Sequence, residues 1–86
     1  MYRVELSREA QRFYDLCDKV AAKKLARCFA ALERNPRGGN NVKALKGYFA
    51  GSFRYRVGDL RVVFTINDRA VVVYVIAIAK RSDVYE

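Results

Sequence analysis

Three arginines stand where the sequence predicts two strands joined by a tight turn. Arg54 and Arg56 belong to the alternating segment Phe53–Val57, and Arg61 follows shortly after a Gly-Asp dipeptide. A two-residue turn at that dipeptide pairs Arg56 with Arg61 and leaves all three arginines on the sheet face opposite the apolar side chains. Like charges that face each other on a sheet are destabilising unless an anion offsets them. Guanidinium groups match phosphate geometry, so the pattern favours a phosphate site over arginines that merely extend to solvent or pair with an aspartate.

The chain has no histidine, and its only cysteines are Cys17 and Cys28. This excludes Ser-His-Asp and Cys-His catalysis, a two-histidine ribonuclease, and histidine or four-cysteine metal sites, so we expect neither metal nor cofactor. Both cysteines stand at apolar helical positions and are expected to be buried thiols. Tyr85 is then one of few groups left for proton transfer, and Lys80 and Arg81 precede it. Nearby arginines lower the pKa of a phenol by stabilising the phenolate; the alternative is a ring that packs on the sheet edge.

Basic residues outnumber acidic ones by 17 to 9, which gives a net charge of +8 on 86 residues. A surplus this large points to a polyanionic partner such as nucleic acid, a membrane surface or an acidic protein, although a basic surface can also serve solubility alone. The surplus divides almost evenly between the two halves of the chain, so an anion site has to be assembled by folding. The length and the 52% apolar content predict one domain spanning residues 1–86.

The sequence shows no apolar leader, and its longest apolar run, Ala70–Ala79, is too short to span a bilayer. Two cysteines outside any disulfide framework fit a reducing compartment. We therefore expect a cytoplasmic protein with no membrane partner.

Hydrophobic periodicity and capping residues predict a strand and two helices in the first half of the chain. Residues 2–6 alternate as a short strand. Ser7 and Asp18 are suitable N-cap residues. Each precedes apolar residues at helical spacing, which are Ala10, Phe13, Leu16 and Cys17 in the first helix and Ala21, Leu25, Cys28, Phe29 and Leu32 in the second. The second helix ends before Pro36, and the short joint predicts an antiparallel helical hairpin.

Three further strands are predicted in the second half. Residues 35–43 are a loop by composition, and residues 44–52 stay irregular. Residues 53–57 and 60–67 form the hairpin, and residues 71–78 are almost wholly apolar, as expected of a central strand. The predicted fold is an α+β domain of β-α-α-β-β-β order, in which the helical hairpin covers one face of a sheet made from the N-terminal strand and a three-stranded antiparallel meander.

Leu45-Lys46-Gly47, the segment 53–64, and the ending Ala79-Lys80-Arg81 with Val84-Tyr85 resemble the RelE/ParE superfamily of bacterial and archaeal toxins. The resemblance covers essentially the whole chain, and its ending favours the RelE branch. It implies the toxin of a type II toxin–antitoxin system, a metal-independent and ribosome-dependent endonuclease that cleaves messenger RNA by 2′-OH attack and inhibits translation. It also implies a cognate RelB-like antitoxin, and operator DNA bound only through the antitoxin complex.

Carried over position by position, the resemblance implies catalytic roles for Arg61, Arg81 and Tyr85. It assigns phosphate or substrate binding to four other cations, Arg54, Arg56, Lys80 and Lys46. The best-known RelE toxins have lysines where this chain has Arg54 and Arg56. Because arginine does not readily release a proton, the resemblance shifts acid–base catalysis toward Tyr85 or the ribosome.

Three other functions fit the same residues. A ParE-like inhibitor of DNA gyrase would share the fold without needing Arg81 and Tyr85 as a pair. A non-catalytic relative would bind only antitoxin and operator DNA, and a generic RNA-binding module is the last alternative. Tyr48, Phe49 and Tyr55 are either platforms on which bases stack or core residues, and a core position is expected for Phe49 and Tyr55.

Overall fold

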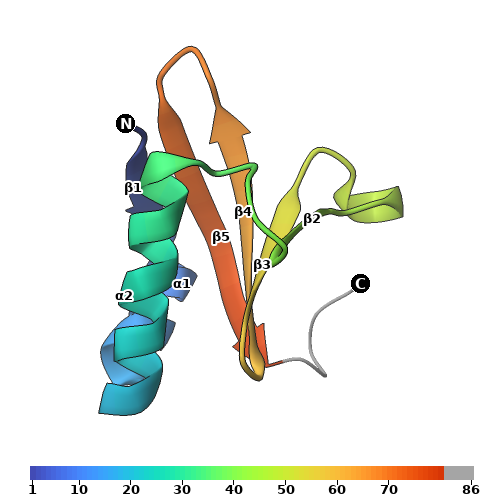
Figure 1. Ribbon diagram of the computed structural model, residues 1–86. Coiled ribbons are helices and arrows are strands. Elements are labelled where there is room, and N and C mark those ends of the chain that lie inside the picture. Colours follow the sequence, from blue (N-terminus) through green and yellow to red (C-terminus); the bar gives the residue numbers. More distant parts are fainter. Residues whose placement is uncertain (81–86) are drawn as a thin grey trace.

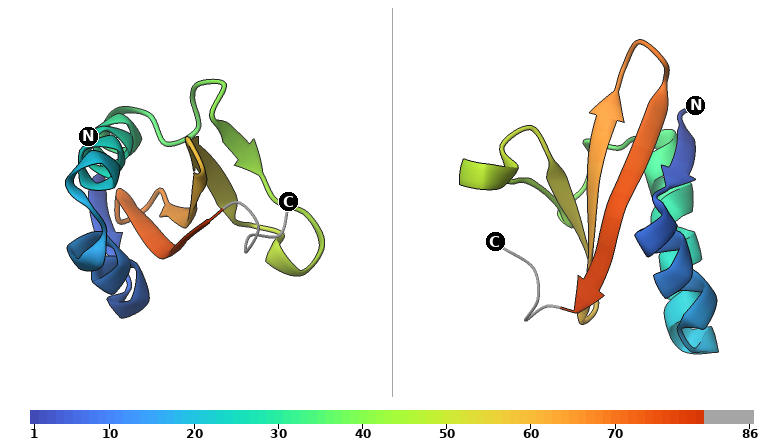
Figure 2. Two further views of the ribbon diagram at one scale, coloured as in Figure 1. Left: turned by 90° about the horizontal axis from the view of Figure 1, so that it is seen from below. Right: turned by 180° about the vertical axis from the view of Figure 1, so that it is seen from behind.

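The order of strands and helices in the computed structural model confirms the predicted α+β fold and adds one strand to it (Figure 1). The structure describes residues 1–80. Both helices lie on one side of the sheet (Figures 1 and 2). Within the described residues the elements are β1 (Arg3–Leu6), α1 (Arg8–Leu16), α2 (Lys19–Arg34), β2 (Val42–Ala44), the 3₁₀ helix η1 (Gly47–Phe49), β3 (Phe53–Val57), β4 (Leu60–Asn67) and β5 (Val72–Lys80).

The sheet of residues 1–80 has the strand order β1-β5-β4-β3-β2. β1 runs parallel to β5, and the other neighbours are antiparallel. The β3–β4 turn has the predicted register, in which Val57 pairs with Leu60 and Arg56 pairs with Arg61. Gly58 has a φ of 56°, a conformation that costs glycine little and most other residues more. The turn type therefore fixes which side chains of these two strands share a face.

β2 is the strand that the sequence analysis placed in a loop and an irregular stretch. It contains three residues, Val42 to Ala44, and pairs with β3 through Val42 and Tyr55, Lys43 and Arg54, and Ala44 and Phe53. Three residues are too few for alternation to be recognised in the sequence. The strand forms because its backbone pairs with the edge of β3. The chain beyond it, around η1, projects from the sheet on the side away from the helices (Figures 1 and 2).

Both helices begin at the predicted caps. The Ser7 hydroxyl accepts a hydrogen bond from the Ala10 amide at 3.0 Å, and the Asp18 carboxylate accepts one from the Ala21 amide at 2.8 Å. Leu16 was predicted to face the core but is 73% exposed, because it is the last residue of α1 and the chain turns there into α2. Neither helix of the described chain is long and apolar enough to cross a membrane.

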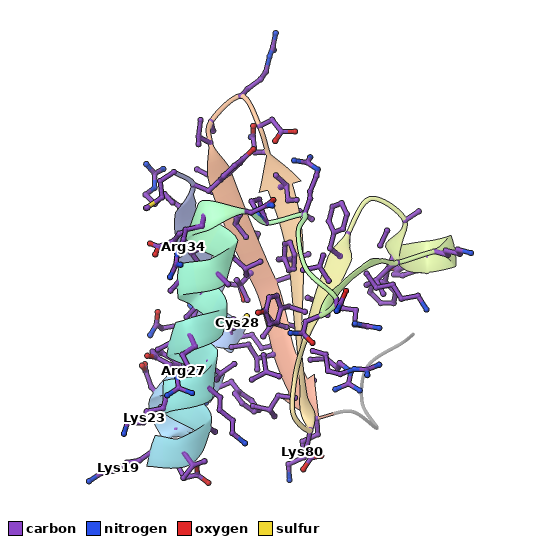
Figure 3. The ribbon with its side chains drawn as sticks, in the orientation of Figure 1. Lys19, Lys23, Arg27, Cys28, Arg34 and Lys80 are labelled. Carbon is purple, nitrogen blue, oxygen red and sulfur yellow. The ribbon has the colours of Figure 1, made fainter. Side chains whose placement is uncertain are left out.

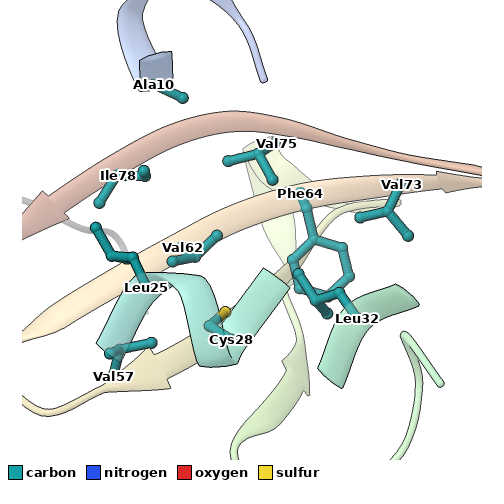
Figure 4. Packing of buried hydrophobic residues seen from close by; sticks show 10 residues of the cluster. All are labelled: Ala10, Leu25, Cys28, Leu32, Val57, Val62, Phe64, Val73, Val75 and Ile78. Atoms are coloured by element: carbon teal, nitrogen blue, oxygen red, sulfur yellow. The ribbon is translucent and has the colours of Figure 1, made fainter. Parts of the chain in front are cut away.

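The core lies between α2 and the middle of the sheet (Figure 4). Leu25, Cys28 and Leu32 form its helical side, and Val62 and Phe64 of β4 are fully buried beneath them. Burial raises the pKa of the Cys28 thiol to about 12, so this cysteine stays a neutral, inert thiol as predicted. Cys17 is half-buried, and its thiol donates a hydrogen bond to the Tyr14 carbonyl oxygen at 3.2 Å.

Asp68, in the β4–β5 turn, joins two distant segments to that turn. Its Oδ1 accepts a hydrogen bond from the Tyr2 hydroxyl at 2.6 Å. The Arg37 guanidinium grips both carboxylate oxygens, at 2.9 and 2.8 Å. These hydrogen bonds, first from Arg37 and then from Tyr2, lower the pKa of Asp68 from 3.8 to about 2.

We expect Asp68→Asn to lower the melting temperature at pH 7 by a few degrees, because a neutral amide cannot accept the bidentate Arg37 contact. The pKa of Asp68 is lower in the folded protein than in the unfolded chain. Its contribution is therefore present above about pH 4 and lost as the pH falls toward 2. Thermal unfolding followed from pH 2 to pH 7 should show the two proteins converging in acid. Melting curves that stay parallel over the whole range would contradict this role.

Candidate functional site

Four cationic side chains share the sheet face that carries no helix. Arg56 pairs with Arg61 across β3 and β4, and Lys43 pairs with Arg54 across β2 and β3. Directly paired residues project to the same face, and so do residues two apart in one strand. The opposite face carries core residues such as Val57. We call Lys43, Arg54, Arg56 and Arg61 the sheet cation cluster.

Two members of the sheet cation cluster are buried and two are exposed. Arg54 and Arg61 are only 6% and 3% exposed, whereas Arg56 and Lys43 lie open to solvent. Arg61 Nη1 donates to the carbonyl oxygens of Gly58 and Leu60, both at 3.0 Å. Arg54 Nη1 donates to the Asn41 carbonyl oxygen, also at 3.0 Å. Because a carbonyl oxygen is neutral, these contacts orient the guanidinium groups without cancelling their charge.

The ion pairs found among the described residues lie on other elements. They join Arg3 to Glu5 and Arg37 to Asp68. Lys43 and Arg56, the exposed cations of the cluster, therefore add positive charge to a sheet face that also carries Arg54 and Arg61. Such a surface attracts anions, and backbone carbonyl oxygens hold the two buried guanidinium groups within it in place.

The structure brings some predicted site residues together and separates others. Arg54, Arg56 and Arg61 meet as expected. Lys46 is exposed on the segment between β2 and η1, which projects on the same side as the cluster. Lys80 does not join them, because its register partner is Leu60 on the helix side. It lines a groove there with Lys24.

Arg81 and Tyr85 lie outside the described residues, so the structure does not place them. Among the described residues no three acidic, cysteine or histidine side chains gather into a group that could hold a metal ion. Tyr55 is half-buried against the core, as predicted. Tyr48 is 95% exposed, and its ring lies edge-on to Phe49 with centroids 5.1 Å apart. Its exposure suits contact with a ligand.

Lys43 is the cluster member that the sequence analysis missed. The residue belonged to a predicted loop, and a loop residue cannot be assigned to a sheet face. The one available signal was the Val-Lys-Ala alternation of residues 42–44, which is too short to distinguish from chance.

Comparison with known proteins gives a family and a set of similar folds. A family model described as the ParE toxin of type II toxin–antitoxin systems, parDE, matches residues 4–85. No curated protein matches the sequence.

Several solved toxin–antitoxin structures contain a similar chain. One in the RelBE2 toxin–antitoxin complex from Mycobacterium tuberculosis is 26% identical, with a TM-score of 0.79 over 95% of this chain and 93% of that chain. One in the archaeal RelE–RelB complex from Pyrococcus horikoshii is 23% identical, with a TM-score of 0.82 over 96% and 98%. One in the intact E. coli RelBE complex is 21% identical, with a TM-score of 0.79 over 93% and 96%.

The contrast between exposed and buried cations gives a testable difference. We expect Arg56→Ala to weaken binding of single-stranded RNA and to leave the melting temperature unchanged or slightly raised, because it removes one of two opposed like charges. Arg61→Ala should lower the free energy of unfolding by about 1–3 kcal/mol, because it empties a buried position and leaves two carbonyl oxygens without their donor.

Fluorescence anisotropy with an RNA oligonucleotide at several salt concentrations, together with thermal melts, measures both effects. Lys43→Ala should behave like Arg56→Ala. If Arg56→Ala unfolded as readily as Arg61→Ala, the exposed arginine would have a structural role instead.

Proposed function

The chain belongs to the ParE toxin family of type II toxin–antitoxin systems, and we propose that it acts as a ribosome-dependent endonuclease that cleaves messenger RNA. The observation that supports this proposal is the sheet cation cluster, in which Arg56 and Arg61 face each other beside Lys43 and Arg54. Closely spaced cations attract a phosphate group, and arginine side chains match its geometry, so a messenger RNA phosphate suits this cluster. The similar folds in RelE–RelB complexes are consistent with a RelE-type activity.

The proposed reaction starts with attack of an RNA 2′-OH on the adjacent phosphate. The hydroxyl loses its proton to a base, the phosphorane carries extra negative charge, and the 5′-oxygen leaves with a proton, which yields a 2′,3′-cyclic phosphate. Arg61 and Arg81 stabilise the phosphorane charge. Arg54 and Arg56 hold the substrate. Tyr85 is the acid–base group, which accepts the 2′-OH proton as phenolate and returns it to the leaving 5′-oxygen as phenol.

The positions of two lysines change the set of residues assigned to substrate binding. Lys43 joins the substrate-binding residues, because its register with Arg54 places it on the same face. Lys80 is left out of the phosphate site, because its pairing with Leu60 places it on the helix side of the sheet. Lys46 extends the cationic surface toward η1 and contacts the substrate strand away from the reacting phosphate.

An acidic antitoxin is the expected protein partner. The net charge of +8 favours a segment rich in carboxylates, and an antitoxin segment that folds on binding could cover the sheet cation cluster. We infer a RelB-like partner from the complexes in which similar chains are found. Operator DNA would then bind through the antitoxin, and the toxin would act in the cytoplasm.

A second candidate function is inhibition of DNA gyrase, favoured by the ParE description of the matching family model. A fold alone does not decide between these activities, because activity depends on the site residues. A gyrase inhibitor has no use for a proton-transfer group beside the arginines, so Tyr85 separates the two candidates.

Replacing Tyr85 with phenylalanine keeps the ring and removes its only ionisable atom. We expect single-turnover cleavage of messenger RNA on ribosomes to fall by about 10²–10⁴, the usual contribution of general acid–base catalysis. Binding to ribosomes and to antitoxin should be nearly unchanged. A 2′-deoxy substitution at the cut site should abolish cleavage by the wild-type protein, because the nucleophile is absent. Cleavage by Tyr85→Phe at the wild-type rate would show that this tyrosine only packs.

Expression of the wild-type chain alone should arrest growth, and co-expression of the antitoxin reading frame beside it should relieve the arrest. Purified protein should cut messages on translating ribosomes and leave the supercoiling activity of DNA gyrase intact. Inhibited supercoiling without message cleavage would instead favour the gyrase inhibitor. Harmless expression of folded protein would count against both.

A further inference from the structure

A second cationic surface runs along α2 (Figure 3). Its members are Lys19, Lys23, Arg27 and Arg34, and all four are exposed. At about 100° of rotation per residue they fall within one narrow sector of the helix, opposite the core residues Leu25, Cys28 and Leu32. From Lys19 to Arg34 the row extends about 22 Å at a rise of 1.5 Å per residue. We call these four residues the α2 basic stripe.

The positions of most of the stripe cations on α2 are electrostatically unfavourable. The N-terminal end of a helix carries partial positive charge, yet the first turn of α2 contains Lys19 and no acidic residue. Lys19 and Lys23, and then Lys23 and Arg27, stand four residues apart, where like charges repel. Only Arg34, in the last turn, is placed where the helix dipole favours a cation.

No ion pair among the described residues involves a residue of the stripe. The two ion pairs of that part of the chain, Arg3 with Glu5 and Arg37 with Asp68, involve other elements. The Asp18 carboxylate, which caps the Ala21 amide, contributes one negative charge at the N-terminal end, fewer than the four positive charges of the stripe. An external polyanion would compensate the stripe.

The surroundings of the stripe favour a phosphate backbone over a protein helix. Ala26 and Ala30 lie along it, and Val20, 64% exposed, is the one large apolar side chain that α2 exposes within the described residues. A docked amphipathic helix needs apolar anchors on both partners, whereas a row of cations at regular spacing suits a line of phosphates.

We propose that the α2 basic stripe binds the phosphate backbone of folded RNA. This inference rests on the proposed function, under which that RNA is ribosomal. The sheet cation cluster lies on the other face of the sheet, away from α2 (Figures 1 and 2). The two surfaces therefore face different directions, so that one holds the ribosome while the other takes the message.

The test compares two full-length variants that lose the same charge. One carries Lys19→Gln, Lys23→Gln and Arg27→Gln. The control carries Arg8→Gln, Arg12→Gln and Arg69→Gln, three exposed arginines outside the stripe and the sheet cation cluster. Binding of each to purified ribosomes is measured over a series of salt concentrations.

The stripe variant should bind ribosomes about tenfold or more weakly at physiological salt, and its slope of log affinity against log salt should shrink by about 2–3, as expected for the loss of three phosphate contacts. Its melting temperature should be equal to or above that of the wild type, because repulsion has been removed. The control should stay within about twofold of the wild type at physiological salt, because its arginines contact no phosphate.

Each alternative result has a defined meaning. Equal weakening of both variants would show a net-charge effect and overturn the inference. Ribosome affinity retained by the stripe variant, with antitoxin affinity lost, would overturn it in favour of a protein partner. If the wild type and the control bind ribosomes through the stripe but cleave no message, the inference stands and the proposed cleavage fails. If no variant binds ribosomes, the inference is overturned.

Discussion

The two-residue turn at Gly58 and Asp59 is the constraint on which the candidate site depends. It sets the register of β3 against β4, and side chains alternate between the faces of a sheet, so a register shifted by one residue would exchange every inward and outward position. With the observed register, Val57 and Val62 enter the core while Arg56 and Arg61 face away from it. The core and the cationic surface are thus two consequences of the same pairing, and neither can move without the other.

Burial of one face determines what the opposite face can do. The helices cover the apolar side of the sheet, which leaves the other side available for a ligand. The same reasoning applies to α2, whose buried row of Leu25, Cys28 and Leu32 directs its cations outward. A chain of 86 residues therefore displays two separate basic surfaces on a body measuring 33 × 28 × 25 Å. Arg54 and Arg61 of the sheet differ from the stripe because backbone carbonyl oxygens accept hydrogen bonds from their guanidinium groups and fix their geometry.

The fold alone leaves the chemistry of this family member open. Toxins that act on different targets can share one scaffold, because the reacting groups occupy a few positions that packing does not dictate. Because this chain has no histidine, few of its side chains could transfer a proton, and arginine cannot readily exchange a proton at neutral pH. The combination makes charge stabilisation the natural task of the sheet cation cluster and assigns proton transfer to another group.

The sequence by itself determined the features that depend on short-range contacts. The caps at Ser7 and Asp18, the turn after Val57 and the pairing of Arg56 with Arg61 all follow from residues a few positions apart, and so does the burial of Cys28 on a helical stripe. Each needs only a local hydrogen bond or a periodic pattern.

Only the tertiary structure decided the placements that depend on distant partners. Lys43 reaches the site because β2 adds to the free edge of β3. Lys80 lies on the helix side of the sheet because of a bulge in β5. Val63 pairs with Ala77 but Phe64 pairs with Val75, so β5 has one extra residue there. Beyond that residue, the side chains of β5 that would face the cluster face the helices instead. An almost wholly apolar strand carries no alternation that could reveal such a bulge. Strand pairing is a contact between segments far apart in sequence, and its register is set by packing, which local patterns do not encode.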